Sequence, residues 1–223
     1  MFAKLRALLG EKTVTPVRFG PYVKEEINLI YNLLFCDDPA LFRPLESEQL
    51  TSWKLTLFND SPDPKAITAI AEEEREESRV RVLAYNWLRK NKHRVPKKRL
   101  LGVVLEVPLA GGLDVLAVYQ DRRIRYINQT GRLVVLEGVL PGMEVPVANL
   151  LAASQEAVNR IGPWDKPRLP PPAKGNIRMT FLVSDGIYFG EGDLSSMQHE
   201  PTAAPIIRSA TELVNLVARA GNK

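Results

Sequence analysis

The sequence predicts an α+β protein in which helices pack on a mostly antiparallel sheet, and the order of its apolar segments is the reason. Residues 100–137 have the pattern of a four-strand meander, and residues 177–189 have the pattern of a separate hairpin. Segments with helical spacing of apolar residues surround both groups, and a helical N-terminal portion precedes them. The strand connections are too short for parallel crossovers, so antiparallel pairing is expected.

The meander is predicted from branched apolar residues and from the turns between them. Val103–Val107 has the composition of a strand that is buried on both faces. Tight turns are expected at Asp121-Arg122 and at Gln129-Thr130-Gly131, where glycine accepts a positive φ. Together with the first, the expected strands are Val115–Gln120, Ile124–Asn128 and Leu133–Leu136.

The second hairpin is expected at Ile177–Val183 and Ile187–Phe189. Asp185-Gly186 between two apolar strands predicts a type I′ turn. Residues 190–205 are expected to form a loop. The proline-rich residues 162–175, which precede the hairpin, are predicted to be an extended surface connector.

Helices are predicted where apolar residues recur at three- and four-residue spacing. The longest is expected at Asp63–Asn91, with an acidic first half at Glu72–Glu77 that suits the positive end of the helix dipole. Glu48–Phe58 is predicted to be helical, although the alternation in Ser52–Phe58 would also suit a strand. The other expected helices are Val23–Phe35, Val145–Ile161 and Ile206–Ala220.

Two parts of the chain are predicted, a helical N-terminal portion at residues 1–62 and an α+β domain at residues 63–223. One continuous domain is the alternative. From Asp63 onward the element order resembles that of profilin-like and roadblock-like sensor and scaffold domains, although the four-strand meander departs from their simplest patterns. This resemblance implies an architecture and not a function.

Composition argues against several functional classes. Cys36 is the single cysteine and only two histidines are present, so neither an intrachain disulfide nor Cys/His zinc ligation is expected, and we predict no metal or cofactor. No apolar run is long enough for a transmembrane helix, and a cytoplasmic location is predicted. The first twelve residues are predicted to form a short docking helix, with weak contact to a membrane surface as the alternative.

The strongest electrostatic feature is residues 89–99, because seven of these eleven residues are basic. One hypothesis is phosphate contact with nucleic acid or anionic lipid. The favoured interpretation is a solvated helix C-terminus, because Lys and Arg complement the helix dipole there and no aromatic residues interleave the charges. The basic residues are Arg89, Lys90, Lys92, Arg94, Lys97, Lys98 and Arg99.

Polar residues near the strand ends are candidates for a ligand pocket. In the meander these are Asp114, Tyr126 and Asn128, although the favoured interpretation places Tyr126 in the core and gives Asn128 to the turn. Around the second hairpin the candidates are Tyr188, Glu191, His199 and Arg208. A small-molecule sensor is therefore the first alternative function.

The sequence contains no GxSxG, P-loop or HExxH motif, and Gly190-Glu191-Gly192 is interpreted as a turn. Cys36 paired with His93 or His199 would be a nucleophile with its base, but a small buried thiol is the favoured interpretation. An enzyme is therefore not the leading hypothesis. That hypothesis is a non-enzymatic interaction or scaffold protein, which self-associates through a sheet edge or through its N-terminal helices.

Overall fold

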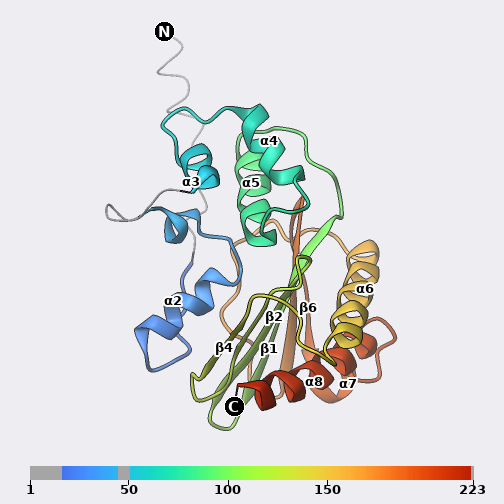
Figure 1. The fold of residues 1–223 in the computed structure, drawn as a ribbon. Helices are drawn as coiled ribbons and strands as arrows, with labels where there is room; N and C mark the ends of the chain where they lie inside the picture. The colour runs from blue at the N-terminus through green and yellow to red at the C-terminus, as the bar shows by residue number, and fades with distance from the viewer. Residues whose placement is uncertain (1–16, 45–50, 222–223) are drawn as a thin grey trace.

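The computed structural model describes residues 17–44 and 51–221, so the docking helix predicted for the first twelve residues lies outside them. Over the described residues the chain forms one six-stranded sheet in the order β4-β3-β2-β1-β5-β6, with every neighbouring pair antiparallel (Figure 1). Helices cover both faces of this sheet. The α+β prediction is therefore confirmed, as are the meander and the separate hairpin, which β1 and β5 join at the centre.

The strands match the prediction best within the meander, where branched apolar residues dominate. β4 has the predicted bounds, whereas β1 and β6 are several residues longer than predicted. The six strands are β1 (Leu100–Leu109), β2 (Gly112–Tyr119), β3 (Ile124–Ile127), β4 (Leu133–Leu136), β5 (Asn176–Val183) and β6 (Gly186–Asp193).

The predicted helix Asp63–Asn91 is wrong as a single element, because two helices packed against each other replace it. They are α4 (Pro64–Glu72) and α5 (Ser78–Lys90), and the acidic residues fall at the break between them. Like charges at helical spacing disfavour a continuous helix. The start of α5 is also held from outside: the Ser78 amide donates to Asp121 at 2.7 Å, and the Ser78 hydroxyl accepts from the Asp121 amide at 3.0 Å.

The remaining helices agree with the sequence in position but not always in length. Only Ser52–Leu57 of the predicted Glu48–Phe58 helix is helical among the described residues, and the last helix begins three residues earlier than Ile206. These elements are α2 (Glu25–Leu33), the 3₁₀ turn η1 (Pro39–Phe42), α3 (Ser52–Leu57), α6 (Glu144–Arg160), α7 (Leu194–Met197) and α8 (Ala203–Ala220).

Two predictions for the second hairpin are wrong. Residues 190–193 continue β6 instead of opening a loop, because Gly190 and Gly192 pair with Met179 and Ile177. The turn is Ser184-Asp185, since Val183 pairs directly with Gly186. Neither turn residue has a positive φ, so the turn is not type I′.

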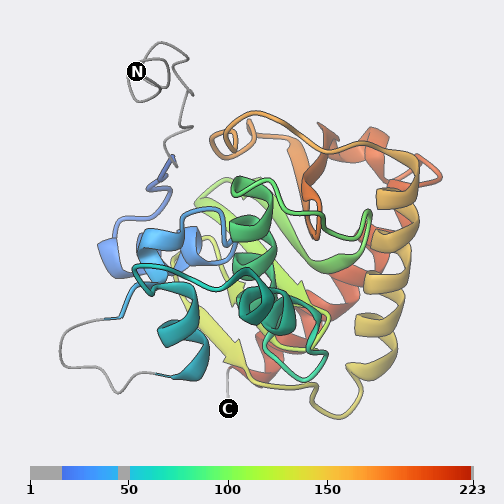
Figure 2. The same cartoon turned by 90° about the horizontal axis from the view of Figure 1, so that it is seen from above.

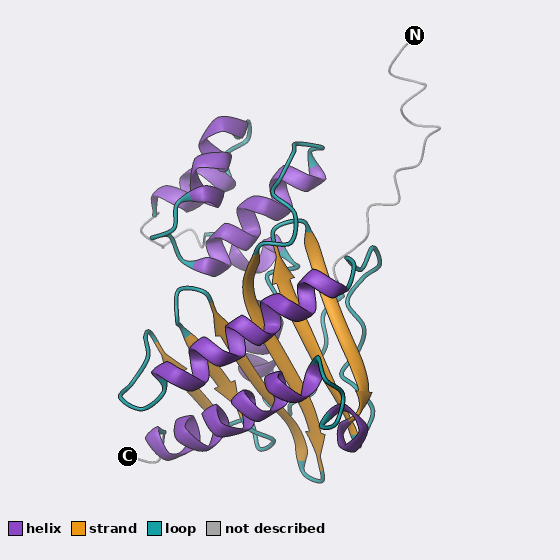
Figure 3. Ribbon diagram, turned by 90° about the vertical axis from the view of Figure 1, so that its right-hand side faces the viewer, coloured by secondary structure: helices purple, strands orange, loops and turns teal. Residues whose placement is uncertain are grey.

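The sheet separates two apolar cores. α6 and α8 cover one face, where they pack on residues such as Val103 and Phe181. α2 and α5 cover the opposite face (Figures 2 and 3). The N-terminal helical portion is tied to that face by the Tyr119 hydroxyl, which donates to the Leu34 carbonyl at 3.0 Å. The division of the chain into an N-terminal portion at residues 1–62 and a domain at residues 63–223 stays a prediction.

No helix among the described residues has the length and apolar character needed to cross a bilayer.

Gly102 is required where β1 passes the Tyr119 ring. A Cβ at this position would lie 2.7 Å from Tyr119 Cδ1 and 3.2 Å from the Val118 carbonyl oxygen. We therefore expect Gly102→Ala to lower the free energy of unfolding by about 1–3 kcal/mol through overpacking, measured by urea denaturation. Gly138→Ala is the matched control, because nothing lies within 4 Å of its Cβ. Equal stability of the two variants would contradict this account.

Candidate functional site

The two edges of the sheet differ in their surroundings, because the proline-rich segment packs against the edge strand β6. Residues 163–172, here called the strap, form the predicted extended connector and lie across the outer end of β5 and β6. The Trp164 amide donates to the Ile187 carbonyl on β6 at 2.7 Å. The Trp164 ring meets Phe189 edge to face, with centroids 5.0 Å apart. The strap therefore covers the first half of the β6 edge, with its backbone contact at Ile187 and its ring contact at Phe189.

Arg168 anchors the strap to the N-terminal portion of the chain. Its buried guanidinium forms an ion pair with Asp37 at 2.8 Å and donates to Asn32 on α2 at 2.8 Å. The guanidinium carbon also lies 3.9 Å from the centre of the Phe35 ring. One side chain thus joins the strap, α2 and the segment that follows α2.

Arg178 and Glu106 continue this buried polar cluster onto the sheet. Arg178 on β5 pairs with Glu191 at 2.5 Å and donates to the strap carbonyls of Leu169 and Pro170 at 3.2 and 2.5 Å. Glu106 on β1 is fully buried and accepts from the Tyr31 hydroxyl at 2.6 Å. Its second oxygen has no hydrogen-bond partner in the described chain and lies 3.9 Å from Arg178. Burial raises the pKa of this carboxyl, although Tyr31 and Arg178 oppose the shift.

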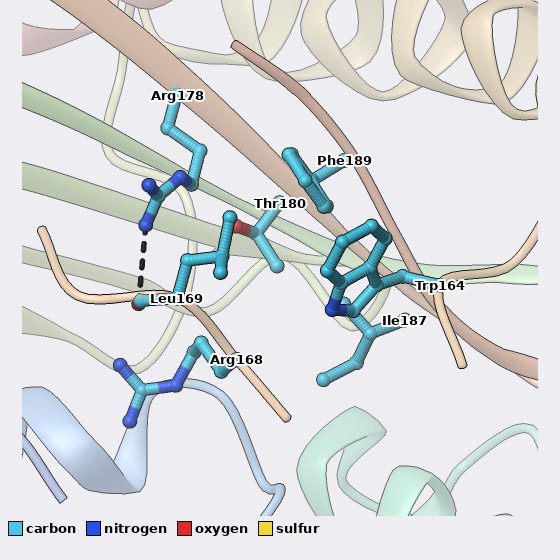
Figure 4. Close-up of a pocket in the computed structure, with 7 residues that line it drawn as sticks. All are labelled: Trp164, Arg168, Leu169, Arg178, Thr180, Ile187 and Phe189. Atoms are coloured by element: carbon cyan, nitrogen blue, oxygen red, sulfur yellow. Dashed lines mark hydrogen bonds between the residues drawn. The ribbon is translucent and has the colours of Figure 1, made fainter. Parts of the chain in front are cut away.

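A small cavity remains where the strap meets the sheet (Figure 4). Its volume is about 10 Å³, which is enough for one water molecule. The cavity is therefore a small packing gap between the strap and the sheet, and it has no room for an organic substrate. It is lined by Trp164, Arg168, Leu169, Arg178, Thr180, Ile187 and Phe189.

The opposite edge of the sheet is formed by β4, which pairs only with β3 in the described chain. The Asn128 amide donates to the Arg132 carbonyl at 3.0 Å, so the next hydrogen-bonded pairs are Tyr126 with Val134 and Ile124 with Leu136. The backbone N–H and C=O groups of Leu133 and Val135 consequently point away from β3. The open edge therefore presents the backbone N–H and C=O groups of two residues.

Exposed aliphatic side chains accompany these backbone groups. Val135 on β4 is 46% exposed, Leu140 in the following connection is 39% exposed, and Val145 in the first turn of α6 is 67% exposed. We call Val135, Leu140 and Val145 the β4 edge patch. Val135 shares its sheet face with Leu133, on the side of α2 and α5, whereas Leu140 and Val145 follow β4 in the chain toward α6, which covers the opposite face.

The end of β4 is fixed by an arginine pair. Arg125 is buried and donates to the Leu136 carbonyl at 2.9 Å and to Glu137 at 2.6 Å. Arg123 donates to Glu137 at 2.8 Å and to Asp121 at 2.9 Å. The hydrogen bond from Arg123 is the main reason that the pKa of Glu137 lies below its usual range. β4 is thus short but held in place.

The predicted pocket residues of the meander lie together, but their polar groups are already paired. Asp114 accepts from the Tyr126 hydroxyl at 2.9 Å and from the Gln129 amide at 2.6 Å. Asn128 accepts from the Thr130 and Arg132 amides, so it shapes the turn. A free polar wall for a ligand is not formed by this group.

The predicted residues around the second hairpin are spread apart. Tyr188 donates to Asp185, and burial is the main reason that its pKa is raised to about 12. Glu191 pairs with Arg178, while His199 and Arg208 are exposed on other segments. Within the described residues, no hydrogen bond or ion pair joins Tyr188, Glu191, His199 and Arg208 to one another.

The basic segment divides into structural and exposed side chains. Arg89 donates to the Asp185 carbonyl at 3.4 Å, Lys98 donates to the Asn159 carbonyl at 2.7 Å, and Arg99 pairs with Glu74 at 2.8 Å. Burial lowers the pKa of Arg89. The exposed members are Lys90, Lys92, Arg94 and Lys97. Phosphate contact through these residues stays a prediction.

Other chemically capable groups do not converge. Cys36 is fully buried, and burial raises the pKa of its thiol. His93 is exposed and stacks on Trp87, with ring centroids 5.8 Å apart. Over residues 17–44 and 51–221, no group of three or more His, Cys, Asp or Glu side chains is placed to hold a metal ion.

Comparison of the chain with protein-family models, with curated proteins and with solved structures finds no match in any of the three. The similarity in element order to profilin-like and roadblock-like domains therefore stays an analogy. Function has to be inferred from the geometry of the chain itself.

Arg168 is expected to be one of the most important side chains for stability. Arg168→Met leaves the mostly buried Asp37 carboxylate without its partner, so we expect the free energy of unfolding to fall by about 3–5 kcal/mol. Arg99→Met is the control, because its partner Glu74 is 80% exposed, and it should cost less than about 1 kcal/mol. Urea denaturation measures both changes. Similar losses in the two variants would show that the buried cluster carries no special weight.

Glu106 should make stability depend on pH. Its folded-state pKa lies above the ordinary value of 4.5, so its stabilising contribution is present below about pH 4.5 and is lost as the pH rises through the folded pKa. Glu106→Gln keeps an acceptor for Tyr31 and removes the titration. The variant's free energy of unfolding, relative to wild type, should therefore increase from acid to neutral pH. A difference that stays constant across this range, as expected for the exposed control Glu156→Gln, would refute the assignment.

Proposed function

We propose that the protein is a non-enzymatic interaction module that pairs with a protein strand through the open edge at β4. The observation that carries this proposal is the asymmetry of the sheet. The strap contacts the β6 edge through Trp164, near the start of that strand, whereas β4 presents outward backbone groups together with the exposed side chain of Val135.

An open strand edge is a ready template for another extended chain, because its N–H and C=O groups form a ladder with any added strand. Many proteins protect such an edge with an outward Lys or Pro, but the central exposed side chain here is Val135. Leu140, in the connection after β4, and Val145, in the first turn of α6, are further exposed aliphatic side chains. This combination favours β-strand addition over simple solvation.

A second copy of the chain is the partner that the edge fits without further assumptions. Two β4 strands related by a two-fold axis would run antiparallel, with Val135 facing the Val135 of the other copy. The outward N–H and C=O of Val135 would then form two reciprocal hydrogen bonds. Such an isologous contact is self-complementary, as in most homodimers. Self-association through a sheet edge is also the leading sequence-based hypothesis.

The absence of an enzymatic role is proposed because the ionisable side chains at the candidate sites are engaged in structural pairs. Arg168 pairs with Asp37, Arg178 with Glu191, and Arg125 with Glu137. A cytoplasmic location is proposed together with this role, since the buried Cys36 thiol has no disulfide partner in the sequence.

Val135→Lys tests the edge directly. We expect wild type to form a dimer whose fraction rises with concentration in size-exclusion chromatography with light scattering, and we expect the variant to shift at least tenfold toward monomer. Lysine repels its counterpart at the two-fold axis. Because residue 135 lies directly opposite Arg125 on β3, circular dichroism must show that the variant stays folded. Leu55→Lys, on the exposed face of α3, is the control and should leave the dimer unchanged. A wild-type chain that stays monomeric at every concentration would reject self-pairing of β4.

A further inference from the structure

A second surface feature lies between α6 and the turn that joins β2 to β3. It is a groove of about 320 Å³, which is within the size range of sites for small organic molecules. Its floor is aliphatic and its rim is polar, and no carboxylate contributes to its lining. The lining residues are Gln120, Arg122, Val147, Ala148, Leu151, Ala152 and Gln155.

Arg122 occupies a position in this turn that would suit glycine. Its amide donates to the Tyr119 carbonyl at 2.9 Å, and the Tyr119 amide donates to the Arg123 carbonyl at 3.1 Å. This is a three-residue hairpin loop whose last residue takes the left-handed conformation, and Arg122 has φ of 65° there. A non-glycine residue in this region of φ carries backbone strain, and such residues cluster at ligand-binding sites.

The side chain of Arg122 has no structural role among the described residues. The neighbouring Arg123 binds both Asp121 and Glu137, but the Arg122 guanidinium forms no hydrogen bond or ion pair with any described residue. The Gln120 carboxamide on the same rim is also unpaired in the described chain. The groove therefore offers a planar cation and an amide donor, both free to bind.

The opposite wall is rigid. Gln155 on α6 accepts from the Leu100 amide at 3.1 Å and donates to the Lys98 carbonyl at 2.9 Å and to Asn159 at 3.0 Å. The bonds to Leu100 and Lys98 fix this wall against the start of β1, and the bond to Asn159 holds the Gln155 side chain along α6. Lys98 lies just beyond it, with its ammonium group on the Asn159 carbonyl. Arg122 thus supplies the one charge among the lining residues, and the cation of Lys98 lies beyond the opposite wall.

We propose that this groove binds a small amphiphilic oxyanion, namely a carboxylate or phosphate group on a short aliphatic body. The guanidinium fork of Arg122 would take the oxyanion in two parallel hydrogen bonds, and Gln120 would add a third donor. The aliphatic body would lie mainly on Ala148 and Ala152, which are exposed, above the nearly buried Val147 and Leu151, and would displace water from this apolar surface. This site is separate from the edge formed by β4, so neither proposal depends on the other.

The test is an NMR titration of the full chain, followed through its backbone amide resonances. The probes are hexanoate and hexyl phosphate, with hexanol as the uncharged probe of the same chain length. We expect the charged probes to shift the resonances of Gln120, Arg122 and Gln155 in a saturable manner, with at least tenfold higher affinity than hexanol. The tighter of the two charged probes identifies the headgroup as carboxylate or phosphate.

Two variants make the result specific. Arg122→Asn removes the guanidinium but keeps a residue that tolerates the left-handed conformation, so the turn should stay folded and affinity should fall at least tenfold. Lys97→Gln removes an exposed cation outside the groove and should leave affinity unchanged. The proposal would be overturned by equal affinity for hexanol, by undiminished binding to Arg122→Asn, or by shifts confined to residues away from the groove.

Discussion

The buried guanidinium of Arg168 is the interaction on which the arrangement of the chain depends. It links residue 168 in the strap to Asp37 and Asn32, which lie more than 130 residues earlier in the sequence. A buried ion pair adds little net stability over an apolar contact, but loss of one partner is severe. The pair therefore specifies where the strap lies more than it strengthens the fold. Arg178 and Glu106 extend the same specification to the centre of the sheet.

The position of the strap decides which sheet edge is available. Once Arg168 and Arg178 hold the strap in place, Trp164 reaches Ile187 and covers the first part of the β6 edge. No described residue covers β4 in the same way, and the end of this strand is held by Arg123 and Arg125, which bind Glu137. A strand that is both open and rigid loses little conformational entropy when it pairs with another strand, which favours binding. The polar clusters at the two edges thus have opposite consequences for association.

Local sequence patterns predicted most of the fold because they report local physics. The meander could be predicted from its branched residues and turns, and β4 lies where the pattern placed it. The errors arose where distant residues decide the outcome. The break between α4 and α5 depends on Asp121, and the length of β6 depends on pairing of its glycines with β5.

The buried cluster and the groove were not predictable, because their residues come from separate segments and no spacing connects them. Glu106 looked like one more residue of a strand, and Arg168 like one more residue of a proline-rich connector. The candidate pocket residues were chosen for their chemical type, but Tyr126 and Tyr188 proved to be paired with Asp114 and Asp185. Arg122 was predicted only as a turn residue. Its open side chain is a consequence of packing that the sequence does not encode locally.

The most direct test of the proposed interaction is amide hydrogen exchange at β4, followed by NMR at increasing protein concentration. The outward amides of Leu133 and Val135 have no partner among residues 17–44 and 51–221, whereas the amides of Val134 and Leu136 bond to β3. The account predicts that Leu133 and Val135 become protected as concentration rises, while Val134 and Leu136 are protected throughout. Fast exchange at Leu133 and Val135 at every concentration would contradict pairing of this edge with a second copy.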